Sequence, residues 1–238
     1  MCTVTFIPKQ NNHFIFTSNR DEAPDRITIP PKFYTENGVK LLYPKDKKAG
    51  GTWIGVSEKH RLVCLLNGGF SAHKPEENYR MSRGIVVRDI LIASLYIKTI
   101  EDYNFKGIEP FTMIILDWEN GLELHQLVWD GTVKHLEKLP NEPKIWSSSS
   151  LYTDPMKHLR VIWFNEFKNQ NNFQLEAINQ FHKTAGSQHP DMGLIMDRGF
   201  VKTTSITQIE KMDLKVTLKY TDLQNNQTSH NEMYFNNQ

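Results

Sequence analysis

The 238-residue sequence has only two cysteines, no long apolar run and a formal net charge of just +1. Two cysteines cannot form the disulfide framework of a small secreted protein, and their spacing does not match a zinc site. No stretch approaches the ~20 apolar residues that a membrane-spanning helix requires. A charge near zero provides no strong field to attract nucleic acid or an anionic membrane. We therefore expect no nucleic-acid partner and no membrane span.

Motifs for metals and common cofactors are also missing. The nine histidines are scattered, and no His-Glu-x-x-His pair occurs. The sequence contains no Gly-x-Gly-x-x-Gly, no Walker motif and no Cys-x-x-Cys-His haem attachment. We predict no bound metal and no resident cofactor.

The first residues do not form a secretory signal. Val4, Phe6 and Ile7 are too few for its apolar region, and the polar pair Asn11 and Asn12 follows soon after. We expect the protein to stay in a reducing cytoplasm.

Apolar patterning predicts a chain that is mainly β structure with a few helices. Short β-branched or aromatic runs predict strands at 2–7, 13–17, 52–56, 62–66, 111–117, 122–129, 200–208, 213–220 and 231–236. Helical spacing predicts helices at 82–97, from 154 onward and at 173–183. Prolines 24, 30 and 31 predict a long irregular connection. The buried face of the second helix is predicted at Leu159, Ile162, Trp163 and Phe167.

The order of these elements predicts the fold class. Strands, a helix, strands, helices and strands do not alternate as a doubly wound parallel sheet requires. The order fits two mostly antiparallel sheets with helices on their outer faces. No internal repeat and no linker divides the chain, so we expect a single domain over 1–238.

Cys2 is the first candidate for chemistry. Removal of Met1, usual before a small residue, would leave a cysteine that carries both a thiol and a free α-amine. A thiol titrates at about 8.5 and an α-amine at about 7.7–8.0, so the amine can accept the thiol proton. One residue would then supply both nucleophile and base.

The charged cluster Arg20, Asp21 and Glu22 ends the second predicted strand. A hairpin would bring it back beside the start of the first strand. An arginine there would favour the Cys2 thiolate. In a regular strand Arg20 and Asp21 would point to opposite faces, so both reach Cys2 only if the strand twists or breaks. The alternative is an exposed charge cluster in a turn.

These residues together resemble the NRDE family, which includes the transport and Golgi organisation protein of animals. The resemblance is carried by Met1-Cys2, by Thr17-Ser18-Asn19-Arg20-Asp21-Glu22 with Pro24 and Arg26, by Gly50-Gly51-Thr52-Trp53-Ile54-Gly55, by Asn67 and by Ser82-Arg83-Gly84. It spans most of the chain, and its motifs are most specific in the first ~85 residues.

The family is related to the N-terminal nucleophile cysteine hydrolases of the penicillin V acylase and bile salt hydrolase type. That relation implies a four-layer αββα sandwich. It assigns Cys2 as nucleophile, Asp21 as the carboxylate that orients its amine, Arg20 as the arginine beside the thiolate and Asn67 as an oxyanion donor. One such donor is typically worth ~3–4 kcal/mol of barrier.

The resemblance also gives candidate substrate contacts. Ser148 stands where related enzymes have a second oxyanion asparagine, and Thr203 lies in a segment that resembles their arginine-threonine strand. Asn19 belongs to the charged motif. Trp53 follows a double glycine that lets backbone approach closely, which favours a pocket wall. Cys64 lies mid-strand and is expected to be buried and inert.

Two functions remain open at this stage. The first is an N-terminal-cysteine hydrolase or acyltransferase that acts on a small non-peptide amide or acyl thioester. The alternative is a non-catalytic binding and trafficking protein for haem or a fatty acyl thioester, because animal relatives are linked to haem handling and lipid metabolism. Kinship of fold does not decide between them.

Overall fold

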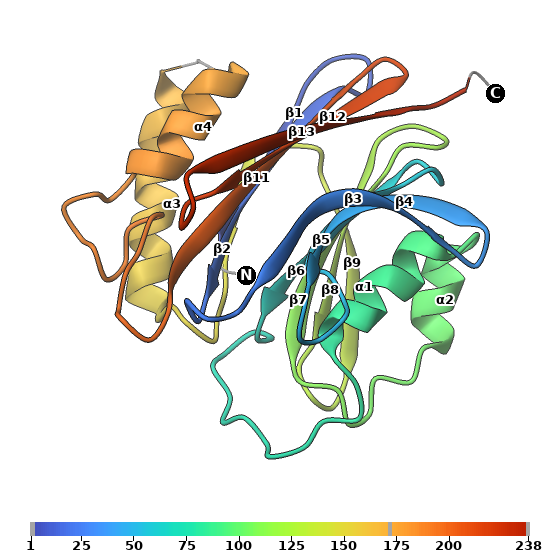
Figure 1. The fold of residues 1–238 in the computed structure, drawn as a ribbon, viewed down its shortest axis with the longest axis horizontal. Coiled ribbons are helices and arrows are strands. Elements are labelled where there is room, and N and C mark those ends of the chain that lie inside the picture. The colour runs from blue at the N-terminus through green and yellow to red at the C-terminus, as the bar shows by residue number, and fades with distance from the viewer. Residues whose placement is uncertain (1–2, 171–172, 237–238) are drawn as a thin grey trace. The chain divides into compact units, whose positions relative to one another are not determined.

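The computed structural model describes residues 3–170 and 173–236, and these form two compact units. The first unit comprises Met1–Arg26 and Glu142–Gln238, and the second comprises Ile27–Asn141. Within the described residues, each unit contains one antiparallel sheet and two helices (Figure 1). The expectation of a single domain over 1–238 stays a prediction.

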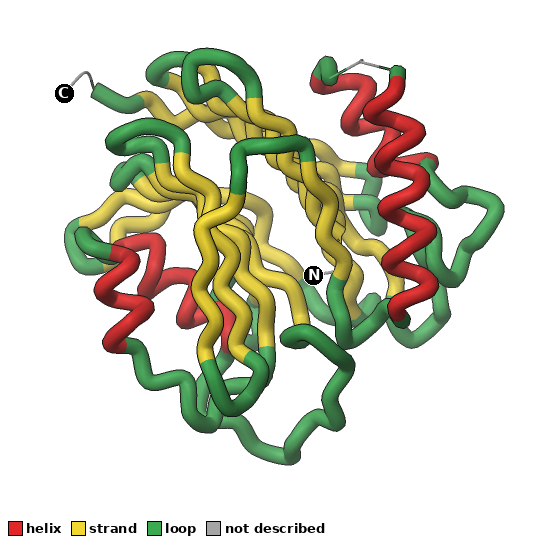
Figure 2. Tube along the Cα trace, turned by 180° about the vertical axis from the view of Figure 1, so that it is seen from behind, coloured by secondary structure: helices red, strands yellow, loops and turns green. Residues whose placement is uncertain are grey.

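The sheet of the first unit has six strands in the order β10-β1-β2-β11-β12-β13 among the described residues. Their bounds are β1 Thr3–Pro8, β2 Phe14–Glu22, β10 Lys144–Ser147, β11 Lys202–Met212, β12 Lys215–Asp222 and β13 Gln227–Tyr234. Two helices, α3 (Asp154–Asn169) and α4 (Leu175–Thr184), lie side by side against this sheet in Figure 1 and, from behind, in Figure 2.

The hairpin of β1 and β2 confirms the prediction from the sequence. Its turn contains Asn11 and Asn12 at φ of 58° and 56°, and asparagine tolerates this left-handed region better than most residues. The backbone N–H of His13 donates to the carbonyl of Gln10 across the turn. The register that results pairs Thr3 with Asn19 and thereby sets the site described below.

The core of the first unit lies between the sheet and its helices. It is a cluster of buried apolar side chains, namely Ile7, Ile15, Phe164, Phe167, Ile178, Phe181 and Leu194. The predicted buried face of α3 was wrong in part, because Ile162 is 37% exposed whereas Arg160 is fully buried. The face of α3 that turns inward therefore includes this arginine together with the apolar Phe164 and Phe167.

The sheet of the second unit has seven strands in the order β3-β4-β5-β6-β7-β8-β9 among the described residues. Their bounds are β3 Thr28–Glu36, β4 Val39–Asp46, β5 Ile54–Ser57, β6 Arg61–Asn67, β7 Phe111–Asp117, β8 Glu123–Trp129 and β9 Lys134–Leu139. Helix α1 (Arg83–Ile92) packs on β5 and β6, and α2 (Tyr96–Asp102) packs on α1. None of the helices in the described residues has the length and apolar character that crossing a membrane requires.

The irregular connection predicted at the prolines was wrong in part. Pro30 and Pro31 lie within strand β3. β3 is an edge strand, and its register shifts between Ile29 and Lys32, so the prolines sit where no ladder donor is needed.

The helix predicted over 82–97 is two helices, because α1 ends at Ile92 and α2 begins at Tyr96. The N-cap prediction is confirmed, since the Ser82 side chain accepts a hydrogen bond from the backbone N–H of Gly84.

The motifs Gly50-Gly51 and Ser82-Arg83-Gly84 are in contact where α1 begins. A Cβ built on Gly84 would lie 2.8 Å from the backbone carbonyl oxygen of Thr52 and 2.9 Å from its nitrogen. A Cβ on Gly51 would lie 2.6 Å from the carbonyl carbon of Gly84. Helix and strand-entry loop therefore touch backbone to backbone, which explains both glycines by packing.

Gly84→Ala is expected to lower the free energy of unfolding by about 1–3 kcal/mol, because backbone must move to admit the methyl group. In a helix without this contact the same change would stabilise by up to ~1 kcal/mol. Chemical denaturation measures the difference, with Lys98→Ala on α2 as the control. A variant as stable as the wild type would show that the contact is not close.

Candidate functional site

Four strand ends meet at one end of the first unit's sheet. Thr3, the first described residue of β1, pairs with Asn19 on β2 and with Ser147 on β10. Asp21 pairs with Thr203 at the start of β11. Four predicted site residues, Asn19, Arg20, Asp21 and Thr203, thus lie on adjacent strands, and Ser148 directly follows β10.

Asp21 is a buried carboxylate held by two hydroxyl groups. The Oη of Tyr152 donates to Oδ2 at 2.5 Å, and the Oγ1 of Thr203 donates to Oδ1 at 2.6 Å. Only 1% of Asp21 is exposed. Because each carboxylate oxygen accepts a hydrogen bond from its own donor, the cost of burying the charge is reduced and the orientation of the carboxylate is fixed.

Arg20 is equally buried, at 2% exposure. Its guanidinium lies 3.6 Å from the carboxylate of Glu22 and 3.5 Å from Oγ1 of Thr204. The register between β2 and β11 shifts at Thr204, which is the extra residue of a β-bulge. The interpretation of this cluster as an exposed turn is therefore wrong.

Asn19 belongs to a buried hydrogen-bond network with His182 of α4. Its amide nitrogen donates to the backbone carbonyls of His182 (3.0 Å) and Leu194 (2.6 Å). Its amide oxygen lies 2.7 Å from Nδ1 of His182, and the Nε2 of that ring lies 2.7 Å from Oγ1 of Thr5. The network ties β1 and β2 to α4. The predicted substrate contact of Asn19 stays a prediction.

Burial lowers the pKa of His182 to about 3, with a smaller contribution from the positive charge of Arg160. The ring is therefore neutral at pH 7. A neutral ring fits the network if Nδ1 donates to Asn19 and Nε2 accepts from Thr5.

The unfolding free energy is expected to decrease below pH 6.5 because of His182. The unfolded chain binds a proton on this ring at about 6.5 and the folded chain only at about 3, so the unfolded state holds more protons between these values. The slope is up to about 1.4 kcal/mol per pH unit. Urea unfolding at pH 7 and pH 5 should show a smaller decrease for His182→Gln and an unchanged decrease for His158→Gln, an exposed control. Equal slopes in all three proteins would contradict this origin.

Ser148 is buried at 1% exposure, and its Oγ lies 3.0 Å from that of Ser150. Trp53 and Asn67 belong to the second unit. Trp53 is 5% exposed and directly precedes β5, while Asn67 is the half-buried last residue of β6, opposite Phe111. The roles assigned to these residues stay predictions.

Met1 and Cys2 lie outside the described residues. Cys64, the other cysteine, is fully buried in β6 and pairs with Ile54 and Ile114 of the neighbouring strands. Its burial agrees with the expected inert role.

Three residues around the site were not predicted from the sequence, namely Tyr152, Arg160 and His182. Each acts through partners more than 100 positions away in the chain, such as the 131 positions between Tyr152 and Asp21. A tyrosine, an arginine on a helix and an isolated histidine carry no local signal of such contacts. Among the described residues, no group of three or more His, Cys, Asp or Glu side chains could hold a metal ion.

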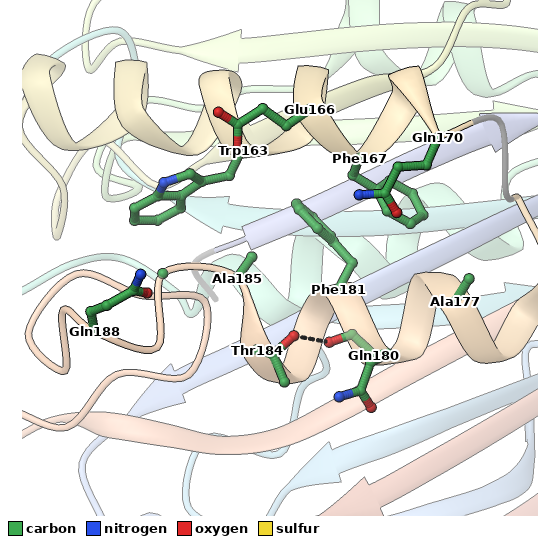
Figure 3. A pocket seen from close by; sticks show the side chains of 11 residues that line it. Trp163, Glu166, Phe167, Gln170, Ala177, Gln180, Phe181, Thr184, Ala185 and Gln188 are labelled. Atoms are coloured by element: carbon green, nitrogen blue, oxygen red, sulfur yellow. Dashed lines mark hydrogen bonds between the residues drawn. The ribbon is translucent and has the colours of Figure 1, made fainter.

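A pocket of about 450 Å³ lies between α3 and α4 (Figure 3). Its apolar part includes the stacked rings of Phe167 and Phe181, whose centroids are 4.9 Å apart, together with Trp163. Gln170 and Gln180, both labelled in Figure 3, also line it. None of the predicted site residues lines this pocket.

Several solved structures resemble this chain in fold. An N-acylethanolamine-hydrolyzing acid amidase ortholog from Caenorhabditis elegans has a TM-score of 0.60 and 13% identity, over 87% of this chain and 92% of that one. A conjugated bile acid hydrolase variant from Clostridium perfringens has a TM-score of 0.58 and 11% identity, over 100% and 97%. A penicillin V acylase from Agrobacterium tumefaciens has a TM-score of 0.54 and 9% identity, over 98% and 86%.

The fold is therefore that of the N-terminal nucleophile hydrolases, with two antiparallel sheets and four helices in the described residues, and the predicted fold class is confirmed. The profile of the family Transport and Golgi organisation 2 matches residues 1–212. The chain belongs to this family, as its resemblance to the NRDE family predicts. No curated protein sequence matches the chain.

Proposed function

We propose that this protein is an N-terminal-cysteine hydrolase or acyltransferase that acts on a small non-peptide amide or acyl thioester. The observation that carries the proposal is the burial of Asp21. This residue lies on β2, the strand beside the start of β1, and two hydroxyl groups donate to its carboxylate. A structural turn residue needs no such burial, whereas a group that must hold an ammonium in one orientation does.

The similar structures support acyl transfer as the type of reaction. They include an acid amidase that hydrolyses N-acylethanolamines, a conjugated bile acid hydrolase and an acylase. One solved variant of the bile acid hydrolase replaces a cysteine by alanine. Identities of 9–13% support the fold alone, so the substrate is named here only by its chemical class.

In the proposed reaction, removal of Met1 frees the α-amine of Cys2. The Cys2 thiol transfers its proton to this amine, and the thiolate attacks the carbonyl carbon of the substrate. The ammonium, held by Asp21, returns the proton to the leaving amine or thiol as the C–N or C–S bond breaks. Water, or an acceptor amine in acyl transfer, then cleaves the thioester formed on Cys2. In this proposal Asn67 is the oxyanion donor and Trp53 is part of the pocket wall, as predicted from the sequence.

The test is a substrate screen with the purified full chain. N-acyl amides and acyl thioesters of several chain lengths are offered, and release of amine or thiol is measured. We expect turnover of at least one class. Tight binding of haemin or an acyl thioester without turnover of any compound would instead support the binding and trafficking function.

A further inference from the structure

Tyr152 joins the buried Asp21 to the segment between β10 and α3. Its side chain is 2% exposed, and its Oη donates to Oδ2 of Asp21 at 2.5 Å. A buried phenol needs a hydrogen-bond partner, and many acceptors would serve. Here the partner is the one carboxylate to which the proposed function gives a role in catalysis.

Two guanidinium groups lie near the ring of Tyr152. The Cζ of Arg160 is 3.4 Å from the ring centroid, and the Cζ of Arg198 is 5.3 Å from it. Both distances are within the ~6 Å over which a cation interacts with an aromatic ring. Positive charge at these positions favours negative charge on the phenol oxygen and so strengthens its O–H as a donor.

Arg160 is fully buried, and its hydrogen bonds go to neutral groups. It donates to Oγ1 of Thr3 at 2.6 Å and to the carbonyls of 192–193 at 3.0 and 2.7 Å. Among the described residues, none of its hydrogen-bond partners is a carboxylate. A buried cation requires compensation. The face of the Tyr152 ring lies against the Arg160 guanidinium, and the hydroxyl of that ring is hydrogen-bonded to the negatively charged Asp21. The same arginine anchors the start of β1.

We infer that Tyr152 is a positioning residue of this site. Its phenol, polarised by Arg160 and Arg198, fixes the Asp21 carboxylate in the orientation that holds the Cys2 ammonium. The inference rests on the proposed function. Without the phenol O–H, Asp21 holds the ammonium less well, the thiolate–ammonium pair of Cys2 becomes less favourable, and Cys2 becomes reactive only at higher pH.

The test is alkylation of Cys2 by iodoacetamide in the full-length protein after removal of Met1, followed by peptide mass mapping from pH 5 to 10. Tyr152→Phe removes one hydroxyl and keeps the ring. We expect the pH midpoint of Cys2 alkylation to rise by about one unit, so that the rate at pH 7 falls about 10-fold.

Tyr96→Phe is the matched control. Tyr96 is also buried, lies 4.3 Å from the guanidinium of Arg61 and hydrogen-bonds to His125, but it belongs to the second unit. Its variant should leave the midpoint unchanged. A loss of packing alone would lower thermal stability in both variants without moving the midpoint in either.

Arg198→Gln provides a second variant in case Tyr152→Phe does not fold. Arg198 is less buried than Arg160, and its loss removes one cation from the ring. The midpoint should move in the same direction by a smaller amount. An unchanged midpoint in every variant that folds, with wild-type Cys2 reactive below pH 8, overturns the role of Tyr152 and leaves the proposed function intact. A wild-type Cys2 that reacts only as an ordinary thiol overturns both.

Discussion

Cys2→Ala is expected to abolish turnover of the amide or thioester that the wild-type protein hydrolyses, with a loss of at least about 10³-fold. The substitution removes the nucleophile, and no other group of the proposed site can form the thioester. Substrate binding should persist, because Trp53, the predicted pocket wall, keeps its side chain. Single-turnover kinetics and equilibrium binding measure the two effects separately.

Two further variants sharpen this result. Cys2→Ser should also be slow, since a hydroxyl ionises far less readily than a thiol. Cys64→Ala removes the buried cysteine of β6 and should leave turnover unchanged. Turnover by Cys2→Ala within about tenfold of the wild type would show that another residue carries the reaction.

Asp21→Asn is expected to lower turnover by about 100-fold or more. The amide keeps the shape of the carboxylate but loses the charge that would hold the ammonium of Cys2. It also presents an N–H₂ group toward one of the two hydroxyl donors, Tyr152 or Thr203. The free energy of unfolding should therefore fall as well, by about 1–3 kcal/mol.

The control for this variant is Asp25→Asn, a change of the same type at an exposed position three residues beyond the strand. It should leave both turnover and stability unchanged. If Asp21→Asn lost stability but kept its turnover, Asp21 would be a structural residue and the proposed role would be wrong.

Local signals allowed much of the fold to be predicted. Asn11 and Asn12 indicate the first hairpin because asparagine tolerates positive φ, and Ser82 indicates the start of α1 because its hydroxyl can cap a helix. Pro30 and Pro31 misled because their effect depends on strand position. On an edge strand with a register shift they cost little, and edge position is not a local property.

The site could be predicted only in part for the same reason. Arg20 and Asp21 stand together in the sequence, so their motif is visible there. The donors that hold Asp21 come from the segment after β10 and from β11, and they meet it only through strand pairing. Arg160 gives the clearest case. Apolar periodicity cannot predict a buried arginine whose acceptors are the hydroxyl of Thr3 and backbone carbonyls of a later loop.

Mass spectrometry of the intact protein, before and after incubation with an activated acyl ester, tests the central claim most directly. The mass before incubation should lack Met1, because the α-amine of Cys2 must be free. After incubation the mass should increase by one acyl group, which peptide mapping should place on Cys2 and which Cys2→Ala should not acquire. A chain that retains Met1, or that is acylated equally with and without Cys2, would contradict the account.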